Sequence, residues 1–568
     1  MAWLLIVSTI AIGLFLSSAF GYFKNYRIAK TSGFPIQFCL ANGLHPVFLI
    51  GNVSARYFFM KLPWPLSRFG EMGYYGWTYD DYMAGNSHNK FGPIFTLVTS
   101  WGNQLVIADP EVALNMNAKW KVFTKPPTQQ SLALFGPNLD TVEGNDWNKH
   151  RRLTAPCFNE KSSSMVWSES RAQAIGMLQQ LKRAGKLGVQ SLADDTQKLA
   201  LHVLSRVAFG LQSNFDAGDK IPPGYTLSFK RSITLVIRNL VICLIFGTKL
   251  AAPIFPATWR EAGRGFVEYD KYVQEIFDRE RNKLEAGNDS SNNLISVLLR
   301  ASEIDDKQSP QSGSLTSAEV KGNCFIFTVA GHDTTANSLA LAIAQLCSRP
   351  HIQDWLAEEI NAIIGTAEPD YEEHFPCLVR CQAALFETLR LFPAVPELPK
   401  YTGESHVPIT LNGKQHILPP HLHCLINIVY LHRMQKYWGA DADEWRPERW
   451  IVHSPTANPN NVGSISKTAT TNHKGETIKE PHRGTYMPWA EGKTCPGSKF
   501  ARVEFVATIA TLFHDYKVRP LPLGDESDAQ ARHRAKKWAT EAHAKGVAMN
   551  LVRPEDVTLV WEHRGSAE

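Results

Sequence analysis

The segment PWAEGKTCPG, residues 488–497, holds one cysteine between turn-forming residues. Gly492 and Gly497 can let the backbone turn tightly around Cys495, and Pro496 disfavours helical geometry at the cysteine. The apolar run SKFARVEFVATIATLF follows at once and predicts a helix whose positive N-terminus lies beside the sulfur. This position, with the basic residues Lys493, Lys499 and Arg502 nearby, should lower the pKa of the thiol and favour a thiolate. We therefore expect Cys495 to be a metal ligand, whereas the alternative for a lone cysteine is a small buried hydrophobe.

A second reactive group is AGHDTT, residues 330–335, in the middle of an apolar run. Asp333 is costly in such a helix unless it has a partner, and Gly331 weakens the helix by about 1 kcal/mol relative to alanine. The Thr334 hydroxyl can donate back to a carbonyl of the preceding turn. An acid beside an alcohol can deliver protons, and the small residues Ala330 and Gly331 leave a groove for a flat cofactor. The alternative is a kinked core helix whose polar groups are satisfied within the protein.

One further motif predicts a buried group of paired charges, and another predicts a binding site for a carboxylate. Glu387 and Arg390 are three residues apart and share a helix face. Their apolar flanks predict burial, so a second cation is expected, and WRPERW at residues 445–450 supplies Arg449. In WNKHRR, Trp147 and Arg151 are four residues apart, and both are donors that suit a carboxylate. Alone, that last motif is typical of a basic surface helix.

In chain order, these motifs resemble those of the cytochrome P450 family. The cysteine loop resembles Phe-x-x-Gly-x-Arg-x-Cys-x-Gly, with Trp489 in place of phenylalanine and Lys493 in place of arginine. A lysine can still meet a haem propionate, although as a point charge and not as a bidentate fork. The resemblance implies that Cys495 is the axial ligand of haem iron, and a thiolate ligand favours O–O cleavage.

The same resemblance assigns roles to the other motifs. Thr334 would steady bound oxygen and Asp333 would relay protons. Glu387, Arg390 and Arg449 would form a structural triad. The residues that the resemblance implies for haem binding are Cys495, Trp147, Arg151, Lys493, Trp489 and Gly331.

The elements that must position these residues are mainly helical. One long helix is expected from Thr316 to Ser348, opened by a capping box of Thr316 and Glu319 and ended before Pro350. Short strands are expected within residues 91–109, and polar loops at about 287–311 and 453–480. The predicted fold class is mainly α with minor β, a cytochrome P450 fold, with a haem domain over residues 63–568.

The N-terminus predicts a membrane anchor. Ala2 to Phe23 carries no charge, and Lys24, Arg27 and Lys30 follow. About 20 apolar residues span a bilayer, and the basic flank keeps the body cytoplasmic. We expect a single-pass anchor over residues 1–23, a linker over 24–62, and the endoplasmic reticulum membrane as the location. A cleaved signal peptide is the alternative, although it usually has a basic start and a shorter apolar run.

Composition and cysteine spacing exclude several kinds of binding site and partner. The 568 residues have a formal net charge of +5, and no basic block stands apart, so a nucleic-acid partner is not expected. The nine cysteines are scattered without CxxC spacing, which disfavours a disulfide framework or zinc site. The apolar segment Ile233–Phe246 is either a core helix or a surface that dips into membrane lipid.

The resemblance also implies cofactors and partners. Haem b, O2 and NADPH-derived electrons from NADPH–cytochrome P450 reductase are expected, and the substrate is a lipophilic small molecule, as in fungal secondary metabolism. Basic residues that could steer the reductase are Lys149, Arg152, Lys499 and Arg502, although they could equally be a solvated face. Candidate pocket residues are Phe135, Phe327, Ala330, Val395 and Leu398.

Two rival functions remain open. The first is a haem-thiolate isomerase or dehydratase, which the acid–alcohol pair disfavours. The second is a non-enzymatic haem protein, which the small residues Ala330 and Gly331 disfavour.

Overall fold

The computed structural model describes residues 2–39, 62–63, 79, 82–83, 87–217, 221–286, 293–306, 314–453, 471–490, 493–545 and 548–565. The chain divides into two compact units, and each is described by itself. Unit 1 comprises Met1–Gln130, Val395–Ala442 and His482–Thr494, and unit 2 comprises Ser131–Ala394, Asp443–Pro481 and Cys495–Glu568. The stretch 63–568, expected as one body, therefore contributes to both units.

Unit 1 is built on a sheet with strand order β1-β2-β3-β7-β4. The strands expected within 91–109 are present as β2 and β3, which pair antiparallel, while β3 pairs parallel with β7. One face of the sheet packs apolar side chains such as Ile107, Ile426 and Leu398 into a core. The elements are β1 (Ile36–Phe38), α5 (Ser87–Phe91), β2 (Ile94–Val98), β3 (Asn103–Ile107), α6 (Pro110–Ala118), β4 (Glu397–Tyr401), β5 (Val407–Leu411), β6 (Lys414–Leu418), β7 (His423–Asn427), α18 (Ile428–Leu431) and α19 (Gln435–Trp438).

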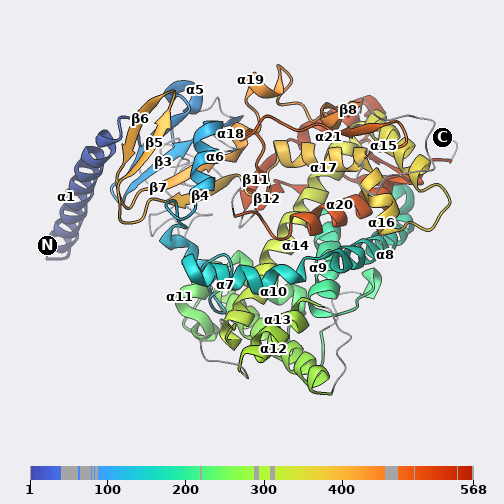
Figure 1. Cartoon of the computed structure of the whole chain (residues 1–568), viewed down its shortest axis with the longest axis horizontal. Helices are drawn as coiled ribbons and strands as arrows, with labels where there is room; N and C mark the ends of the chain where they lie inside the picture. The colour runs from blue at the N-terminus through green and yellow to red at the C-terminus, as the bar shows by residue number, and fades with distance from the viewer. Residues whose placement is uncertain are drawn as a thin grey trace. The chain divides into compact units, whose positions relative to one another are not determined.

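Helix α1 (Ala2–Thr31) projects from this sheet (Figure 1). It runs past Phe23, and β1 follows and pairs with β2. The part of the predicted linker that the structure describes is therefore largely regular. The physical reason is that the segment docks on the sheet, with Ala29 buried. Residues 40–61 of that linker lie outside the described residues.

Unit 2 is mainly helical. Its elements are η1 (Pro127–Leu132, which begins in unit 1), α7 (Gly144–Thr154), α8 (Glu160–Ala184), α9 (Leu192–Phe209), α10 (Phe229–Arg238), α11 (Leu240–Phe246), α12 (Ala257–Glu285), α13 (Leu294–Asp306), α14 (Ser317–Cys347), α15 (Pro350–Ile363), α16 (Tyr371–His374), α17 (Val379–Leu391), η7 (Pro447–Trp450), β8 (Ile451–His453), β9 (Glu476–Ile478), α20 (Ser498–Phe513), β10 (Tyr516–Pro520), α21 (Asp528–Trp538), β11 (Ala542–Lys545), β12 (Ala548–Leu551) and β13 (Leu559–His563). Short 3-10 turns join several of these elements.

The long helix expected from residue 316 is α14, and it packs against α9, α17, α20 and β12. Thr316 accepts a hydrogen bond from the Glu319 backbone N–H at 3.2 Å, and the Glu319 carboxylate accepts from the Thr316 N–H at 2.8 Å. This is the predicted capping box. Gly322 lets the helix approach another segment, because a Cβ there would lie 2.4 Å from the Gly136 carbonyl oxygen.

Helix α13 lies where a polar loop was expected. Leu294, Ile295, Leu298 and Leu299 are buried in one core cluster, and their spacing is that of one helix face. Burial of this face offsets the polar composition of the surrounding stretch. The flanking residues 287–292 and 307–313, like 454–470 of the second predicted loop, lie outside the described residues.

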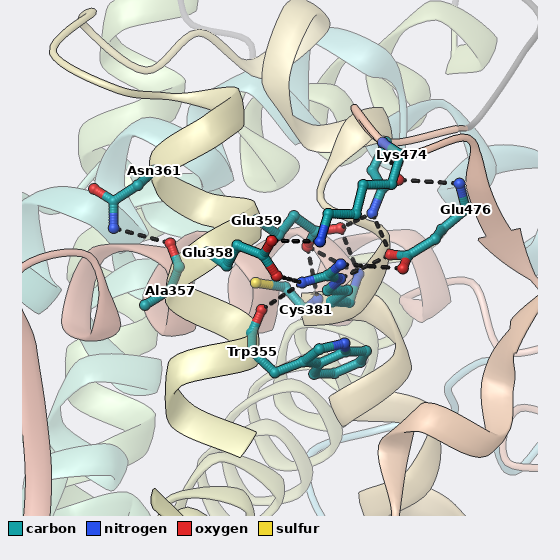
Figure 2. Close-up of polar contacts among 10 residues, drawn as sticks. Trp355, Ala357, Glu358, Glu359, Asn361, Cys381, Lys474 and Glu476 are labelled. Carbon is teal, nitrogen blue, oxygen red and sulfur yellow. Dashed lines mark hydrogen bonds and ion pairs between the residues drawn. The ribbon is translucent and has the colours of Figure 1, made fainter. Parts of the chain in front are cut away.

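The N-terminus of α17 is held by a buried polar network in unit 2 (Figure 2). The Glu359 carboxylate of α15 accepts from the backbone N–H groups of Arg380 and Cys381 at 2.9 and 3.3 Å. The Arg380 guanidinium donates to Glu476 of β9 at 2.7 and 3.0 Å and to Glu358 at 2.7 Å. Burial raises the pKa of Glu359 to about 7, although these donors oppose the rise. The network thus fixes one end of the helix that carries Glu387 and Arg390.

The apolar segment Ile233–Phe246 forms parts of two helices. Ile233 and Val236 of α10 are fully buried, whereas Leu244 and Ile245 of α11 are exposed. The first half is therefore a core helix. The second half has a buried side, with Ile242 and Cys243, and an exposed apolar side. Among the described residues, no single helix passes a test of length and hydropathy for crossing a membrane; the pair Phe229–Arg238 and Ile242–Ala251 passes it only together, bent by 95°.

Candidate active site

Cys495 lies three residues before Ser498, the first residue of α20, as the sequence predicts. It is exposed, whereas the other eight cysteines are buried. The Gly497 backbone N–H donates a hydrogen bond to its sulfur. Gly497 has an ordinary φ of −82°, so the turn does not need a glycine for its backbone angle. Residues 491–492, including Gly492, lie outside the described residues.

The expected lowering of the Cys495 pKa is wrong for the polypeptide alone. Desolvation by the surrounding protein raises the pKa of the thiol, and the Gly497 N–H and the Arg151 guanidinium oppose this only in part. Two of the basic residues expected to help are engaged elsewhere. Lys499 forms an ion pair with Glu160, and Arg502 donates to Gln382 at 2.6 Å. Metal coordination would deprotonate this thiol outright.

The half of the cysteine loop before residue 495 belongs to unit 1. Trp489 is half-buried there, and the Lys493 ammonium lies 4.9 Å from the centre of the Trp120 ring. Ala490 adopts a positive φ of 54°, an unusual angle for a residue with a side chain. The tight turn within the described part of the loop therefore lies at an alanine.

Helix α14 is buried along most of its length but has an accessible strip. Ala330 is exposed, and Phe327 and Thr334, which flank it at helical spacing, are partly exposed. The neighbouring positions Val329, His332 and Thr335 are buried. Such a strip on a core helix leaves room for a bound group.

The predicted acid and alcohol lie on or beside this strip. The Thr334 hydroxyl donates to the Ala330 carbonyl at 2.6 Å, which is the expected back-bond. Burial raises the pKa of Asp333 to about 6, while hydrogen bonding from Asn337 and the charge of Arg238 oppose the rise. Arg238 is exposed at the end of α10, and within the described residues its guanidinium has no hydrogen bond or ion pair. Asp333 can therefore gain or lose a proton near neutral pH.

Gly331 does not line the groove that was expected to hold a flat cofactor. A Cβ at this position would lie 3.3 Å from Leu204 Cδ1, so its missing side chain faces α9. Glycine here permits close packing of two helices. Ala330 is the small residue that is exposed on the strip.

Trp147 and Arg151 are both half-buried on α7. In the part of the chain that the structure describes, no hydrogen bond or ion pair holds the Arg151 guanidinium. The neighbouring Lys149 already has an anionic partner, because its ammonium donates to Glu319 of the α14 cap at 2.6 Å. Burial alone would raise the pKa of Glu319, but Lys149 and its other donors lower it to about 2. This ion pair ties α7 to the start of α14.

The triad is assembled around Glu387. Arg390 donates to both of its carboxylate oxygens at 2.8 Å, and Arg449 donates to one of them at 2.9 Å. Glu387 and Arg390 are fully buried. The Arg446 backbone N–H and the Trp450 indole N–H also donate to Glu387, at 2.8 and 2.9 Å. The group joins α17 to the 3-10 turn η7 and acts as scaffold.

The pocket candidates are divided between the units. In unit 2, Phe327 and Ala330 share the strip on α14, while Phe135 packs in an aromatic cluster with Phe266 and Phe325 at centroid distances of 4.8 and 4.9 Å. In unit 1, Val395 is half-buried and Leu398 packs against the core of the sheet. Within unit 2, Phe135 and Phe327 pack against the same core cluster.

Sequence reasoning missed several residues that shape the site. Asn337 and Trp450 are hydrogen-bond donors to the two key acids, and Asn337 could have been found from its spacing four residues after Asp333. Strand β12 of the β11–β12 hairpin also packs against α14, and the Met549 N–H donates to the Ala394 carbonyl at 3.0 Å. No local signal in the sequence points to that hairpin, because the contact joins distant parts of the chain.

The site fits a thiolate-bound haem. Three features lie in unit 2: the exposed Cys495 with its N–H donor, Arg151 with no anionic partner among the described residues, and the accessible strip on α14. The family model for cytochrome P450 matches residues 62–540. The chain belongs to the cytochrome P450 family. Members of this family are haem-dependent oxidoreductases that act as monooxygenases on O2 with electrons from a redox partner, and this reaction class applies to the chain.

Curated relatives agree with this assignment. A cytochrome P450 monooxygenase of Arthrobotrys oligospora is 28% identical, over 97% of this chain and 98% of its own. A cytochrome P450 monooxygenase of the phomenoic acid biosynthesis cluster of Leptosphaeria maculans is 27% identical, over 74% of each chain. A solved cytochrome P450DA haem domain has the same fold, with a TM-score of 0.63 at 17% identity, covering 93% of this chain and 98% of its own.

Proposed function

We propose that this cytochrome P450 inserts one oxygen atom from O2 into a lipophilic small molecule of secondary metabolism. Haem b would be its cofactor, and NADPH–cytochrome P450 reductase its electron donor. The observation that carries the proposal is the exposed Cys495, held by the Gly497 N–H at the start of α20. The relative from the phomenoic acid cluster supports a role in secondary metabolism.

Each protein residue has a defined part in this proposal. Cys495 would hold the iron, and Arg151, Trp147 and Lys493 would bind the propionates. When bound, the haem supplies oxygen activation. The Thr334 hydroxyl would turn from the Ala330 carbonyl to donate its hydrogen bond into the site. Asp333, with its pKa raised to about 6 by burial, would hold the next proton and take it up from the side of the exposed Arg238.

The substrate is proposed to be lipophilic because Phe327 and Ala330 form the accessible strip. Entry from a membrane is consistent with the exposed apolar side chains Leu244 and Ile245 of α11. Of the basic residues considered for reductase docking, Arg152 is exposed, and Lys149 and Lys499 form ion pairs with Glu319 and Glu160. A contact between these residues and an acidic partner would weaken as the salt concentration rises.

We further propose that α1 anchors the protein in the endoplasmic reticulum membrane with the body on the cytoplasmic side. The support is the uncharged run from Ala2 to Phe23, followed by basic residues. The described side chains of the first half of α1 are exposed, including Leu14, Phe15 and Phe20.

The central test is the carbon monoxide difference spectrum of the reduced protein. We expect the red-shifted Soret band of a thiolate-bound haem in the wild type and its loss in Cys495→Ser. Cys324→Ser, a buried cysteine of α14, is the matched control and should keep the band. A band that survives in Cys495→Ser would assign the iron to another ligand. A screen of lipophilic compounds for displacement of iron-bound water would then define the substrate class.

A further inference from the structure

Helix α1 has two parts that differ in their contacts. Before Gly21, its described side chains are nearly all exposed. At Gly21 the helix meets the turn between β2 and β3: a Cβ at Gly21 would lie 2.3 Å from the Ser100 carbonyl oxygen. At Gly13, by contrast, a Cβ would meet nothing within 4 Å. The helix therefore leaves the protein surface at Gly21.

The second part of α1 is docked by specific contacts. The Asn25 amide donates to the Thr99 carbonyl at 2.8 Å, and the Asn103 amide donates to the Asn25 carbonyl at 2.8 Å. Ala29 is buried at 2% exposure. Just beyond the helix, the Ser32 carbonyl oxygen lies 2.8 Å from His416 Nδ1 of β6. Paired contacts on both sides of one residue fix a helix in direction as well as in position.

The length of the undocked part matches a bilayer core. At 1.5 Å per residue, residues 2–20 extend about 28 Å, and the hydrocarbon core of a bilayer is about 30 Å thick. Lys24 and Arg27 begin within one turn of the docking point. If residues 2–20 lie in the bilayer, its surface must therefore lie level with the turn at Ser100.

Aromatic side chains gather at that level. Trp101, in the same turn, is 58% exposed, and Phe23 and Phe38 are 60% and 44% exposed. Tyr26 stacks on Phe38 with a centroid distance of 5.7 Å. Tryptophan and tyrosine concentrate at membrane–water interfaces, because their rings are apolar bodies with a polar edge. We call Phe23, Tyr26, Phe38 and Trp101 the aromatic collar.

We propose that the aromatic collar is a second membrane contact, and that α1 is a rigid extension of unit 1 and not a loose tether. The occupant of this surface is the headgroup region of the bilayer that holds α1. The inference rests on the proposed anchoring by α1. It adds that the β2–β3 turn lies in the interface and that the docking at Gly21 holds it there.

The test uses the haem-loaded full chain in vesicles of phosphatidylcholine and phosphatidylserine. Trp101→Cys carries an environment-sensitive fluorophore; the other cysteines are buried, apart from Cys495. Spin-labelled lipid in the headgroup region quenches a label that lies at that depth. The reference label is at Glu111→Cys, an exposed residue of α6, which follows the opposite end of β3. We expect about twofold or stronger quenching at position 101 than at position 111.

The docking is tested with a matched glycine pair in the Trp101→Cys background. Gly21→Ala forces a backbone clash and should undock the helix, although alanine makes α1 slightly more apolar and more helix-prone. Gly13→Ala makes the same change in open space. We expect Gly21→Ala to reduce quenching at position 101 about twofold or more while vesicle co-sedimentation persists, and Gly13→Ala to change neither.

The results that would overturn the collar alone differ from the result that would overturn the anchor as well. Co-sedimentation with equal quenching at positions 101 and 111, or equal quenching in both glycine variants, would keep the anchor and refute the collar. Absence of co-sedimentation in the wild type would refute the anchoring and the collar together.

Discussion

The side-chain amide of Asn337 donates hydrogen bonds to both the backbone carbonyl and the carboxylate of Asp333, at 2.8 and 3.0 Å. The acid is thereby fixed one helical turn from its donor, in a largely desolvated position. Burial raises the pKa of Asp333 to about 6, and Asn337 is the first contact that opposes the rise. Burial and this opposing hydrogen bond together set the pH at which the acid holds its proton.

The pH dependence of turnover should therefore report on Asp333. If this acid carries the proton, product formation should titrate with an apparent pKa near 6, and Asp333→Asn should lose that step. Asn337→Leu removes a donor that lowers the pKa, so the step should move to higher pH. The measurement is turnover with reductase and a lipophilic substrate from pH 5 to 8. An unchanged pH profile in Asp333→Asn would exclude this role.

Asp333 should also make the free energy of unfolding fall as the pH rises. Because the folded pKa of Asp333 lies above its unfolded value of 3.8, its contribution to stability is fully present below that value and is lost as the pH rises through about 6. The wild type should therefore lose unfolding free energy between pH 5 and 7 relative to Asp333→Asn. Urea titrations at several pH values measure this difference, and parallel curves for the two proteins would contradict it.

Thr334→Ala should retain haem but divert reducing equivalents from product into peroxide, by roughly tenfold or more if the hydroxyl assists proton delivery. Thr328→Ala is a close control, because the Thr328 hydroxyl donates to the Cys324 carbonyl at 2.7 Å in the same helix but is fully buried. The ratio of peroxide to product distinguishes the two variants. Equal coupling in both would mean that Thr334 acts only on the helix.

Trp450→Phe tests a neutral donor to the buried Glu387. The variant keeps most of the ring but leaves a carboxylate oxygen short of one hydrogen bond, so it should cost about 1.5–3 kcal/mol in unfolding free energy. In Trp167→Phe the lost donor serves a neutral acceptor, the Pro369 carbonyl at 3.2 Å, and the cost should be about 0.5–1.5 kcal/mol. Urea unfolding of the two variants provides the comparison. A larger loss in Trp167→Phe would argue against a special role for Trp450.

Arg380 offers a comparison of a buried and an exposed ion pair on one guanidinium (Figure 2). Both partners lie at 2.7 Å, but the Glu476 side chain is 8% exposed and the Glu358 side chain 48%. Glu476→Gln should cost about 3–5 kcal/mol because it leaves a buried charge with fewer partners, whereas Glu358→Gln should cost about 0–1 kcal/mol. Urea unfolding at neutral pH measures both. Equal losses would show that burial does not govern this network.

Some features followed from local sequence alone. Cys495 had to lie at a helix start because an apolar-periodic run begins three residues later, and Thr334 had to face the carbonyl one turn back. The Thr316–Glu319 cap and the Glu387–Arg390 pair are likewise set by a spacing of three residues. Such relations are fixed by helical geometry whatever surrounds the helix. The reaction class followed from the combination of these motifs.

The tertiary structure decided what depends on distant neighbours. The direction of the Cys495 pKa shift is set by desolvation, which spacing does not reveal, and Gly331 faces Leu204 because α9 packs there. Helix α13 forms within a polar stretch because a core exists to bury its leucines, and α1 continues past Phe23 because the β2–β3 turn receives it. Periodicity specifies an element and its faces, but only packing determines what each face meets and therefore which charges, protons and surfaces the protein can use.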